Sequence, residues 1–265
     1  MDTTGVIAHI TDWLRGYCER NRQAGFVVGV SGGIDSAVVS ALCARTGLPT
    51  LCLEMPIHQA PSQVQRALDH IAQLRQRHAN VEMVTVQLTS VFDELVKRLS
   101  QGQDKESNDL ALANTRSRLR MTALYYFAGL HRYLVAGTGN KVEDFGVGFF
   151  TKYGDGGVDL SPIADLTKTE VYAVAKGLGI IGSIMQARPT DGLWGDDRSD
   201  EDQIGATYPE LEWAMDLRDR QVDVSKLGLD ERQRKVLAIF DQRRAANRHK
   251  IEPIPVCSIP PALRM

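Results

Sequence analysis

The hydrophobic and polar positions change period several times along the first 180 residues of the chain. Short apolar runs typical of buried strands span residues 26–30, 50–55, 81–88 and 133–136. Longer stretches with apolar residues at helical spacing span residues 3–20, 37–45, 63–78, 89–99, 109–131 and 167–178. Because apolar strands alternate with helices, the pattern predicts an α/β fold with a doubly wound parallel sheet that is covered on both faces.

The last third of the chain has a different pattern, in which helices follow one another without strands. Helices are predicted at 209–215 and 231–246, and an extended tail is predicted at 250–255. Residues 188–207 are the least regular stretch, and a long loop with glycine and tryptophan in a compact domain is a lid candidate. Its acidic part, residues 196–202, is equally well explained as a solvated face. We expect one domain over residues 1–265, with added C-terminal helices.

The composition narrows the class of protein without identifying it. At 265 residues and 43% apolar content, the chain is long enough to bury a sizeable core in one large domain. A net charge of −2 argues against a general nucleic-acid surface, and no apolar run reaches membrane-spanning length. The N-terminus lacks a basic and apolar signal segment, and the four cysteines form no Cys-x-x-Cys pair. We therefore expect a cytoplasmic protein without zinc, cluster or disulfide-exchange chemistry, and without a nucleic-acid or membrane partner.

The first apolar run leads into a small-residue turn that carries the strongest chemical signal. The turn and the start of the helix after it read Ser31-Gly32-Gly33-Ile34-Asp35-Ser36. The order of strand, glycine turn and helix places free N–H groups and the positive end of the helix dipole at the carboxyl end of a strand. Phosphate is the usual ligand of such a corner. The two glycines allow close approach of the backbone, and the two serines add hydroxyl donors.

Asp35 is the unexpected member of this turn, because a carboxylate repels phosphate unless a cation lies between them. We therefore interpret Asp35 as a Mg²⁺ ligand. The turn is neither a Walker A loop nor a dinucleotide fingerprint, since the Gly-Lys-Ser/Thr and Gly-x-Gly-x-x-Gly spacings are both absent. A strand-to-helix turn without a ligand is the plainer alternative.

Ser-Gly-Gly-Ile-Asp-Ser resembles the pyrophosphate loop of the N-type ATP pyrophosphatases, which have an adenine-nucleotide alpha-hydrolase-like (Rossmann-like) fold. Beyond this loop, the chain closely resembles ammonia-dependent NAD synthetases over nearly its whole length. The segments that carry the resemblance, in the family's order, are Arg118-Leu119-Arg120-Met121, the run GFFTKYGDGGVDL at 148–160, Leu166-Thr167-Lys168, Arg188-Pro189-Thr190-Asp191 and His249-Lys250. The run at 148–160 is long and very specific.

The resemblance implies a two-step ligase reaction, with Mg²⁺ as cofactor and ATP as co-substrate. ATP would adenylate the carboxylate of nicotinic acid adenine dinucleotide (deamido-NAD) and release pyrophosphate. Ammonia would then attack the acyl-adenylate to give NAD and AMP. The family is dimeric, so the resemblance also implies a homodimer, with the long helix from Asp109 as a natural interface element.

The resemblance also implies roles for individual residues. The residues expected at ATP are Ser31, Gly32, Gly33, Ile34, Asp35, Ser36, Thr138, Lys168 and Thr190. Asp35 and Glu143 are expected to hold Mg²⁺, and together with Lys168 they form the expected catalytic set. The lysine and the metal would neutralise the repulsion between the attacking carboxylate and the α-phosphate. The residues expected at deamido-NAD are Arg118, Lys152, Asp159, His249 and Lys250.

Three departures from the family pattern bear on these roles. Asn140-Lys141 stands where many ammonia-dependent members show Asp-His. Glu54 stands where many members carry an arginine that contacts ATP, and the spacing from Glu143 to Phe149 is one residue longer than in many members. No glutaminase domain follows, so ammonia is expected from solution or from a separate partner. The rival interpretations are another N-type ATP pyrophosphatase, similar to GMP synthetase or to a tRNA-modifying enzyme, and a non-catalytic nucleotide-binding protein.

Overall fold

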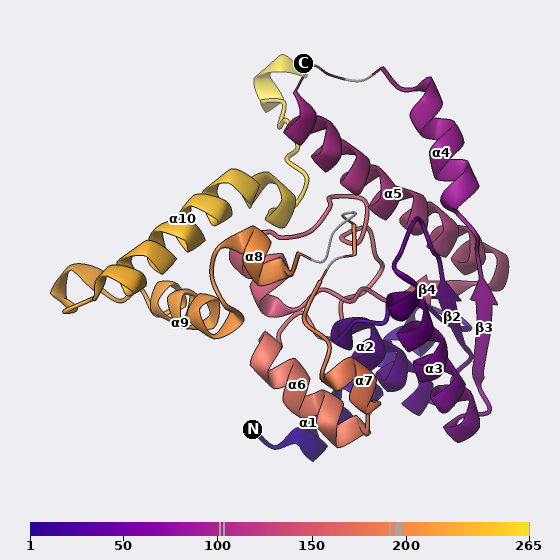
Figure 1. Cartoon of the computed structure of the whole chain (residues 1–265). Coiled ribbons are helices and arrows are strands. Elements are labelled where there is room, and N and C mark those ends of the chain that lie inside the picture. Colours follow the sequence, from indigo (N-terminus) through magenta and orange to yellow (C-terminus); the bar gives the residue numbers. More distant parts are fainter. Residues whose placement is uncertain (101, 103, 191, 194–197, 265) are drawn as a thin grey trace.

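Four parallel strands form the central sheet, in the order β3–β2–β1–β4 (Figure 1). They are β1 (Gly25–Gly29), β2 (Thr50–Glu54), β3 (Val81–Thr85) and β4 (Tyr133–Val135). Val27 of β1 pairs with Leu51 on one side and with Val135 on the other. The computed structural model describes residues 1–100, 102, 104–190, 192–193 and 198–264. The predicted parallel sheet is confirmed.

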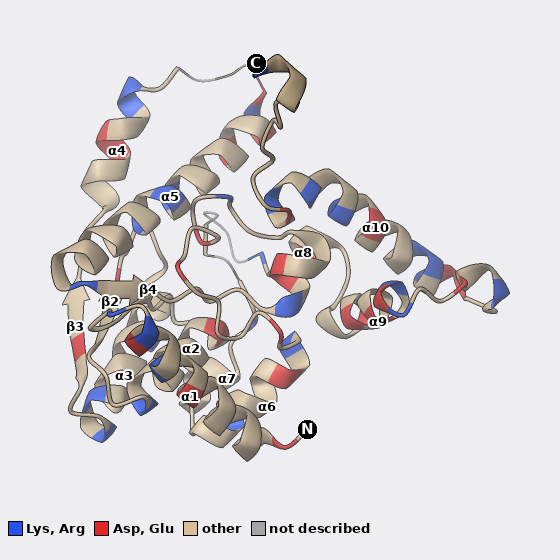
Figure 2. Cartoon of the chain, turned by 180° about the vertical axis from the view of Figure 1, so that it is seen from behind, with Lys and Arg blue, Asp and Glu red and all other residues tan. Residues whose placement is uncertain are grey.

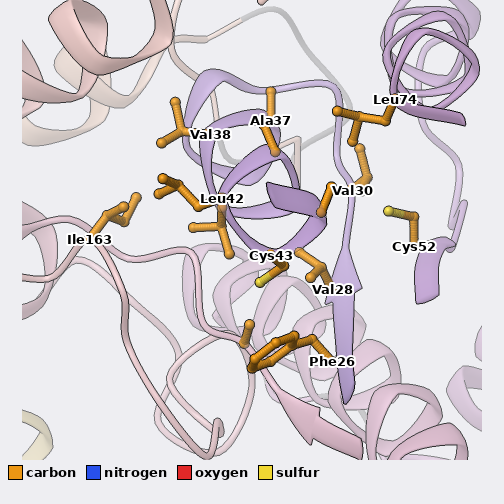
Figure 3. Close-up of a cluster of buried hydrophobic side chains, with 14 of the residues drawn as sticks. Phe26, Val28, Val30, Ala37, Val38, Leu42, Cys43, Cys52, Leu74 and Ile163 are labelled. Carbon is orange, nitrogen blue, oxygen red and sulfur yellow. The ribbon is translucent and has the colours of Figure 1, made fainter. Parts of the chain in front are cut away.

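Helices cover both faces of this sheet, because successive side chains of a strand point to opposite sides. In β1, Phe26 and Val28 belong to one apolar cluster, whereas Val27 belongs to the cluster on the opposite face. Figure 3 shows Val28 beside Cys43 of the following helix, with Phe26 below them in the same cluster. The helices that contribute to the first cluster are α1 (Thr3–Arg20), α2 (Ile34–Arg45), α3 (Pro61–Arg77), α6 (Lys168–Leu178) and α7 (Gly182–Met185). Those on the other face are α4 (Thr89–Arg98) and α5 (Lys105–His131).

A second core lies to one side of these layers and is built by the C-terminal helices (Figure 1). We call residues 200–251 the C-terminal helical unit; its helices are α8 (Asp200–Ile204), α9 (Tyr208–Asp219), the short 3₁₀ turn η2 (Val224–Lys226) and α10 (Glu231–Ile251). A π-helix, η1 (Val142–Val147), contributes Val142 and Val147 to this second core. A further 3₁₀ turn, η3 (Pro261–Leu263), lies near the C-terminus. In the described part of the chain, no helix is both long and apolar enough to span a membrane.

Several predicted boundaries were wrong, and local capping explains one of them. The second helix begins at Ile34 rather than at residue 37, so part of the predicted phosphate loop forms its first turn. The long helix α5 begins at Lys105 rather than near Asp109, because the Asp104 carboxylate accepts the N–H of Ser107 at 2.8 Å and caps the helix. The second and third strands end at Glu54 and Thr85, earlier than predicted.

The prediction of an extended tail from residue 250 was also wrong, since α10 continues to Ile251. Lys250 is held in the helix because its Nζ donates to the carbonyl oxygens of Gly148 and Phe150 at 2.8 and 2.7 Å. Lys and Arg side chains recur along α10 (Figure 2), and several of them bond backbone carbonyls in this way.

The π-helix η1 was not predicted, although the extra residue between Glu143 and Phe149 falls within this region. A π-turn contains one more residue than an α-turn, so it accommodates the longer spacing between these two fixed points. The carbonyls at its C-terminal end are bonded by α10: Asn247 donates to Val147 at 2.9 Å, and Arg244 donates to Phe145 and Gly146. Hydrogen bonds from side chains of α10 therefore stabilise the wide turn.

Leu42 tests the packing between α2 and the sheet, because its side chain is fully buried (0% exposed). Leu42→Ala is expected to lower the free energy of unfolding by about 2–5 kcal/mol, since it leaves a cavity in a closely packed core. Chemical denaturation measures this loss. The matched control is Val91→Ala on α4, where the side chain is 51% exposed and the expected change is below about 0.5 kcal/mol. Equal losses in the two variants would contradict the arrangement.

Candidate active site

The predicted phosphate loop is held by its own serine side chains. The Ser36 hydroxyl accepts the N–H of Ser31 at 3.2 Å and donates to the carbonyl of Gly33 at 3.0 Å, while the Ser31 hydroxyl accepts the N–H of Gly33 at 3.2 Å. Gly32 has φ +80°, and a Cβ there would lie 2.5 Å from the carbonyl oxygen of Gln63, so only glycine fits. The loop therefore presents the N-terminus of α2 in a fixed conformation.

This loop lines a cavity at the carboxyl edge of the sheet, where ligands of parallel sheets usually bind. The segment after β2 and the turn 137–139 after β4 line the same cavity. Among the predicted ATP residues, Thr138 and Thr190 also line it. Residues brought together from four parts of the chain thus surround a single space.

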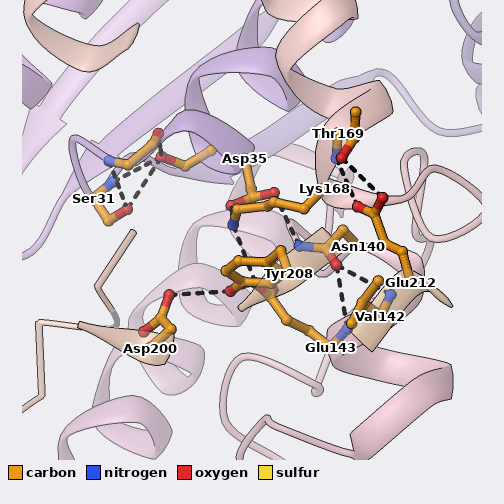
Figure 4. Close-up of polar contacts among 12 residues, drawn as sticks. Ser31, Asp35, Asn140, Val142, Glu143, Lys168, Thr169, Asp200, Tyr208 and Glu212 are labelled. Carbon is orange, nitrogen blue, oxygen red and sulfur yellow. Dashed lines mark hydrogen bonds and ion pairs between the residues drawn. The ribbon is translucent and has the colours of Figure 1, made fainter. Parts of the chain in front are cut away.

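Lys168 lies at the centre of this site, between two carboxylates (Figure 4). Its side-chain nitrogen is 2.6 Å from Asp35 Oδ2 and 3.1 Å from Glu143 Oε1, and the residue is only 3% exposed. A capping box between Thr167 and Glu170 starts α6 and so fixes where Lys168 begins. Burial alone would lower the pKa of Lys168, but the two carboxylates outweigh it and hold this pKa above its ordinary value. The lysine is therefore a permanent cation.

Asn140 joins the two carboxylate-bearing segments. Its amide nitrogen donates to Asp35 Oδ1 at 3.2 Å, and its amide oxygen accepts the N–H groups of Val142 and Glu143 at 3.1 and 3.2 Å. Asn140 is fully buried. The sequence reasoning gave Asn140 no role at the site, although it noted both the small-residue turn at the end of β4 and the departure from the family pattern at Asn140.

Tyr208 is a second missed residue of the site (Figure 4). Its hydroxyl donates to Glu143 Oε1 at 2.5 Å and lies 3.2 Å from Asp200 Oδ2. Burial, followed by the charges of Glu143 and Asp200, raises the pKa of Tyr208 well above its ordinary value, so the hydroxyl keeps its proton. Nothing in the periodicity around residue 208 connects it with a glutamate 65 positions away.

Asp144 adds a further carboxylate to the cavity wall. The carboxylate oxygens lie 2.2 and 2.3 Å from the place that a Cβ of Gly139 would take, so they occupy space that only a glycine leaves. Burial raises the pKa of Asp144 to about 8, with further contributions from Glu143, Asp155 and Asp35. The lining of the cavity is strongly acidic around Lys168.

Four of the residues expected at deamido-NAD form a separate group outside this cavity lining. Arg118 Nε donates to the carbonyl of Lys152 at 3.3 Å, and Lys152 Nζ donates to the carbonyl of His249 at 2.5 Å. Lys250 is one residue further along α10. These contacts bring Arg118, Lys152, His249 and Lys250 together.

Asp159, the fifth expected residue, bonds elsewhere. Its carboxylate accepts the N–H of Val135 at 2.8 Å and the hydroxyl of Tyr125 at 3.0 Å. These bonds fix the loop after η1 against β4. The role of Asp159 at a substrate stays a prediction.

Glu54 stands where many family members carry an arginine, and in this structure an arginine of α5 lies at the same strand end. Glu54 is buried, and burial raises the pKa of its carboxyl group. Arg120 Nε donates to the carbonyl of Met55 at 3.0 Å, and the arginine lines the cavity. A guanidinium from α5 thus reaches the end of the strand where the family arginine is expected.

The lid candidate at 188–207 is described only in part, because Asp191 and residues 194–197, with two acids of the acidic run, lie outside the described residues. In the described part, the carbonyl of Gly192 accepts Gln59 Nε2 at 2.9 Å, and the carbonyl of Leu193 accepts Arg116 Nη1 at 3.0 Å. Residues 187–190, 192 and 193 line the cavity. Closure of this segment over a ligand stays a prediction.

The comparison with known proteins settles the family. The profile of NAD synthase matches residues 6–254, which is most of the chain. The chain belongs to the NAD synthase family. An NH(3)-dependent NAD(+) synthetase from Carboxydothermus hydrogenoformans is 41% identical over 205 residues, covering 77% of this chain and 81% of that protein.

Solved structures of the NAD synthase family have the same fold. NMN synthetase from Francisella tularensis aligns with a TM-score of 0.84 and 29% identity, covering 98% of this chain and all of that one. NH3-dependent NAD synthetase from Campylobacter jejuni, solved with the nitrate ion, aligns with a TM-score of 0.77 and 26% identity over 97% of this chain and all of that one. The fold is therefore adenine-nucleotide alpha-hydrolase-like, as predicted, and the chain is an ATP-dependent ligase of this family.

Asp144 is expected to make the stability of the chain depend on pH. Its pKa is raised to about 8 in the folded chain, whereas an unfolded aspartate titrates near pH 4. Between these values the folded chain binds a proton that the unfolded chain has lost, so this contribution to stability falls as the pH rises. Asp144→Asn is neutral at every pH. Its melting temperature is expected to rise relative to wild type between about pH 5 and pH 8.

The measurement is thermal unfolding in EDTA, so that no divalent metal changes the charge of the site. Asp165→Asn is the matched control, since the Asp165 side chain is 98% exposed and lacks the burial that raises the pKa of Asp144. A difference between Asp144→Asn and wild type that does not change with pH would contradict the raised pKa of Asp144.

Proposed function

We propose that the chain catalyses the ATP-dependent amidation of deamido-NAD with ammonia, which gives NAD, AMP and pyrophosphate. The observation that carries this proposal is the buried Lys168 between Asp35 and Glu143, beside a phosphate loop, in a chain of the NAD synthase family. A non-catalytic nucleotide-binding protein has no need for a buried ammonium between two half-buried carboxylates at the edge of its phosphate site, because removing such charges from water is costly.

The reaction needs charge neutralisation more than proton transfer. In the first step a carboxylate oxygen of deamido-NAD attacks the α-phosphorus of ATP, a new O–P bond forms, and pyrophosphate leaves. In the second step ammonia attacks the acyl carbon, a C–N bond forms, the bond to AMP breaks and one proton is lost. The N–H groups at the start of α2 bind phosphate oxygens, and Lys168 stabilises negative charge as it develops. The attacking group is the substrate's own carboxylate, so no nucleophilic side chain is required.

Asp35 and Glu143 are the residues proposed to hold Mg²⁺. Mg²⁺ in nucleotide sites is commonly bound by one or two carboxylates together with phosphate oxygens and water. Within the described residues, no three His, Cys, Asp or Glu side chains are grouped closely enough to hold a metal ion by themselves. A two-carboxylate set that ATP completes therefore fits these residues. When bound, the cation would screen the charge of the ATP phosphates.

Arg118, Lys152, His249 and Lys250 are proposed to bind deamido-NAD, because their contacts already gather them at one end of α10. Ammonia is proposed to come from solution or from a separate partner. We also propose that the enzyme works in the cytoplasm, which the buried free thiols of Cys18, Cys43 and Cys52 support.

The decisive experiment measures NAD and pyrophosphate from deamido-NAD, ATP, Mg²⁺ and ammonium. Both products are expected in equal amounts. Asp35→Asn keeps the shape of the side chain but removes its charge, and kcat is expected to fall by about 10²–10³. Asp165→Asn, an exposed acid outside the site, should keep wild-type activity. Pyrophosphate formed only with xanthosine monophosphate or RNA would favour another pyrophosphatase, and no ATP cleavage would favour a non-catalytic protein.

Nicotinic acid mononucleotide is a second candidate acceptor. The alignment with NMN synthetase from Francisella tularensis, over 98% of this chain, favours including it. Both acceptors carry the same nicotinic acid carboxylate, so the chemistry at Lys168 is unchanged. The same assay, run with either acceptor at equal concentration, ranks them by kcat/KM.

We propose that the chain forms a homodimer through α5. Tyr126 and Leu130, one helical turn apart on α5, are 66% and 61% exposed, and exposed apolar side chains that gather on one helix face often mark an interface. A double variant with Tyr126→Glu and Leu130→Glu is expected to be a monomer in light scattering after gel filtration, whereas wild type should be a dimer. Val91→Glu, at an exposed apolar residue of α4, is the control and should remain dimeric.

A further inference from the structure

Tyr208 connects the C-terminal helical unit with the centre at Lys168. It is the first residue of α9 and only 3% exposed. Its backbone N–H donates to Glu201 Oε1 at 2.9 Å, and the capping box between Thr207 and Glu210 fixes the turn around it. The direction of the tyrosine side chain is therefore set by the helical unit rather than by the sheet.

One side chain contacts both charged partners at the centre (Figure 4). The Tyr208 hydroxyl donates to Glu143 Oε1 at 2.5 Å, and Lys168 Nζ lies 4.7 Å from the centre of the tyrosine ring. The first contact is a hydrogen bond to a charged acceptor, and the second is a cation–π interaction. Asp200 Oδ2 lies 3.2 Å from the same hydroxyl.

Tyr208 and Lys168 both contact the same oxygen of Glu143, and the other oxygen remains available to a ligand. Glu143 Oε1 accepts from both Tyr208 and Lys168, whereas Oε2 has no hydrogen-bonding partner among the described residues. A carboxylate that is fixed through one oxygen presents the other in a defined direction. Without the tyrosine hydroxyl, only the lysine would restrain the rotation of this carboxylate.

We propose that Tyr208 is a positioning residue, which orients Glu143 toward the bound cation and keeps Lys168 beside Asp35. This proposal rests on the proposed function, in which Glu143 is a Mg²⁺ ligand and Lys168 stabilises developing charge. Tyr208 belongs to α9, so the hydroxyl that contacts Glu143 comes from the helical unit.

Tyr208→Phe tests the proposal, since it removes the hydroxyl and keeps the ring with its packing and its cation–π contact. We expect kcat to fall about tenfold, the typical effect of losing a hydrogen bond to a charged group, while KM for ATP and for deamido-NAD changes less than about twofold. Mn²⁺ affinity, measured by electron paramagnetic resonance with a non-hydrolysable ATP analogue, is expected to fall about three- to tenfold. The melting temperature should change little.

Phe240→Leu is the matched control for a purely structural effect. Phe240 is fully buried in the core of the helical unit, so the variant should melt at a lower temperature but keep the Mn²⁺ affinity and kcat of wild type below that temperature. The proposal is overturned if Tyr208→Phe binds Mn²⁺ and turns over like wild type, or if Phe240→Leu reproduces its losses. Failure of wild type to make NAD would instead refute the proposed function, and the Mn²⁺ measurement would still decide the role of Tyr208.

Discussion

The contact of one buried ammonium with two carboxylates sets the conditions for the rest of the active site. Lys168, Asp35 and Glu143 come from three different elements, and removing three charges from water is costly unless each keeps good partners. The Asn140 amide and the Tyr208 hydroxyl supply those partners. The fold must therefore hold α2, η1 and α6 at one point, with little freedom between them.

The architecture meets this requirement by joining two cores. In the parallel sheet the phosphate loop and the turn after β4 lie at the same edge. The core around α2 fixes the distance between them. The second core includes residues of α9 and η1, so the element that carries Glu143 packs in one core and α2, which carries Asp35, packs in the other. Lys168 lies on α6, which packs against α2 of the first core and against α9 of the second.

The order of the four strands and the long helices between them was predictable from their apolar runs and spacing, whereas the short elements η1, α7 and α8 were not predicted. The phosphate loop was predictable because its residues exceed what a turn needs. The sequence resemblance selected Asp35, Glu143 and Lys168, and the structure brings these three together. Asn140 and Tyr208 escaped prediction because their partners are distant in sequence and their types are common in cores and turns. Element ends such as Lys105 and Ile251 depended on caps and tertiary bonds that periodicity does not record.

The wide turns of η1 also determine how this chain can be compared with shorter relatives. One residue added to an α-helix would rotate everything after it by about 100° about the helix axis, but a π-turn absorbs the addition locally. The positions on either side, Asn140 and Phe149, can therefore keep their geometry in a chain that is one residue shorter. Glu143 and Asp144 both lie inside this wide turn, and Glu143 is distinguished there by its contact with Lys168.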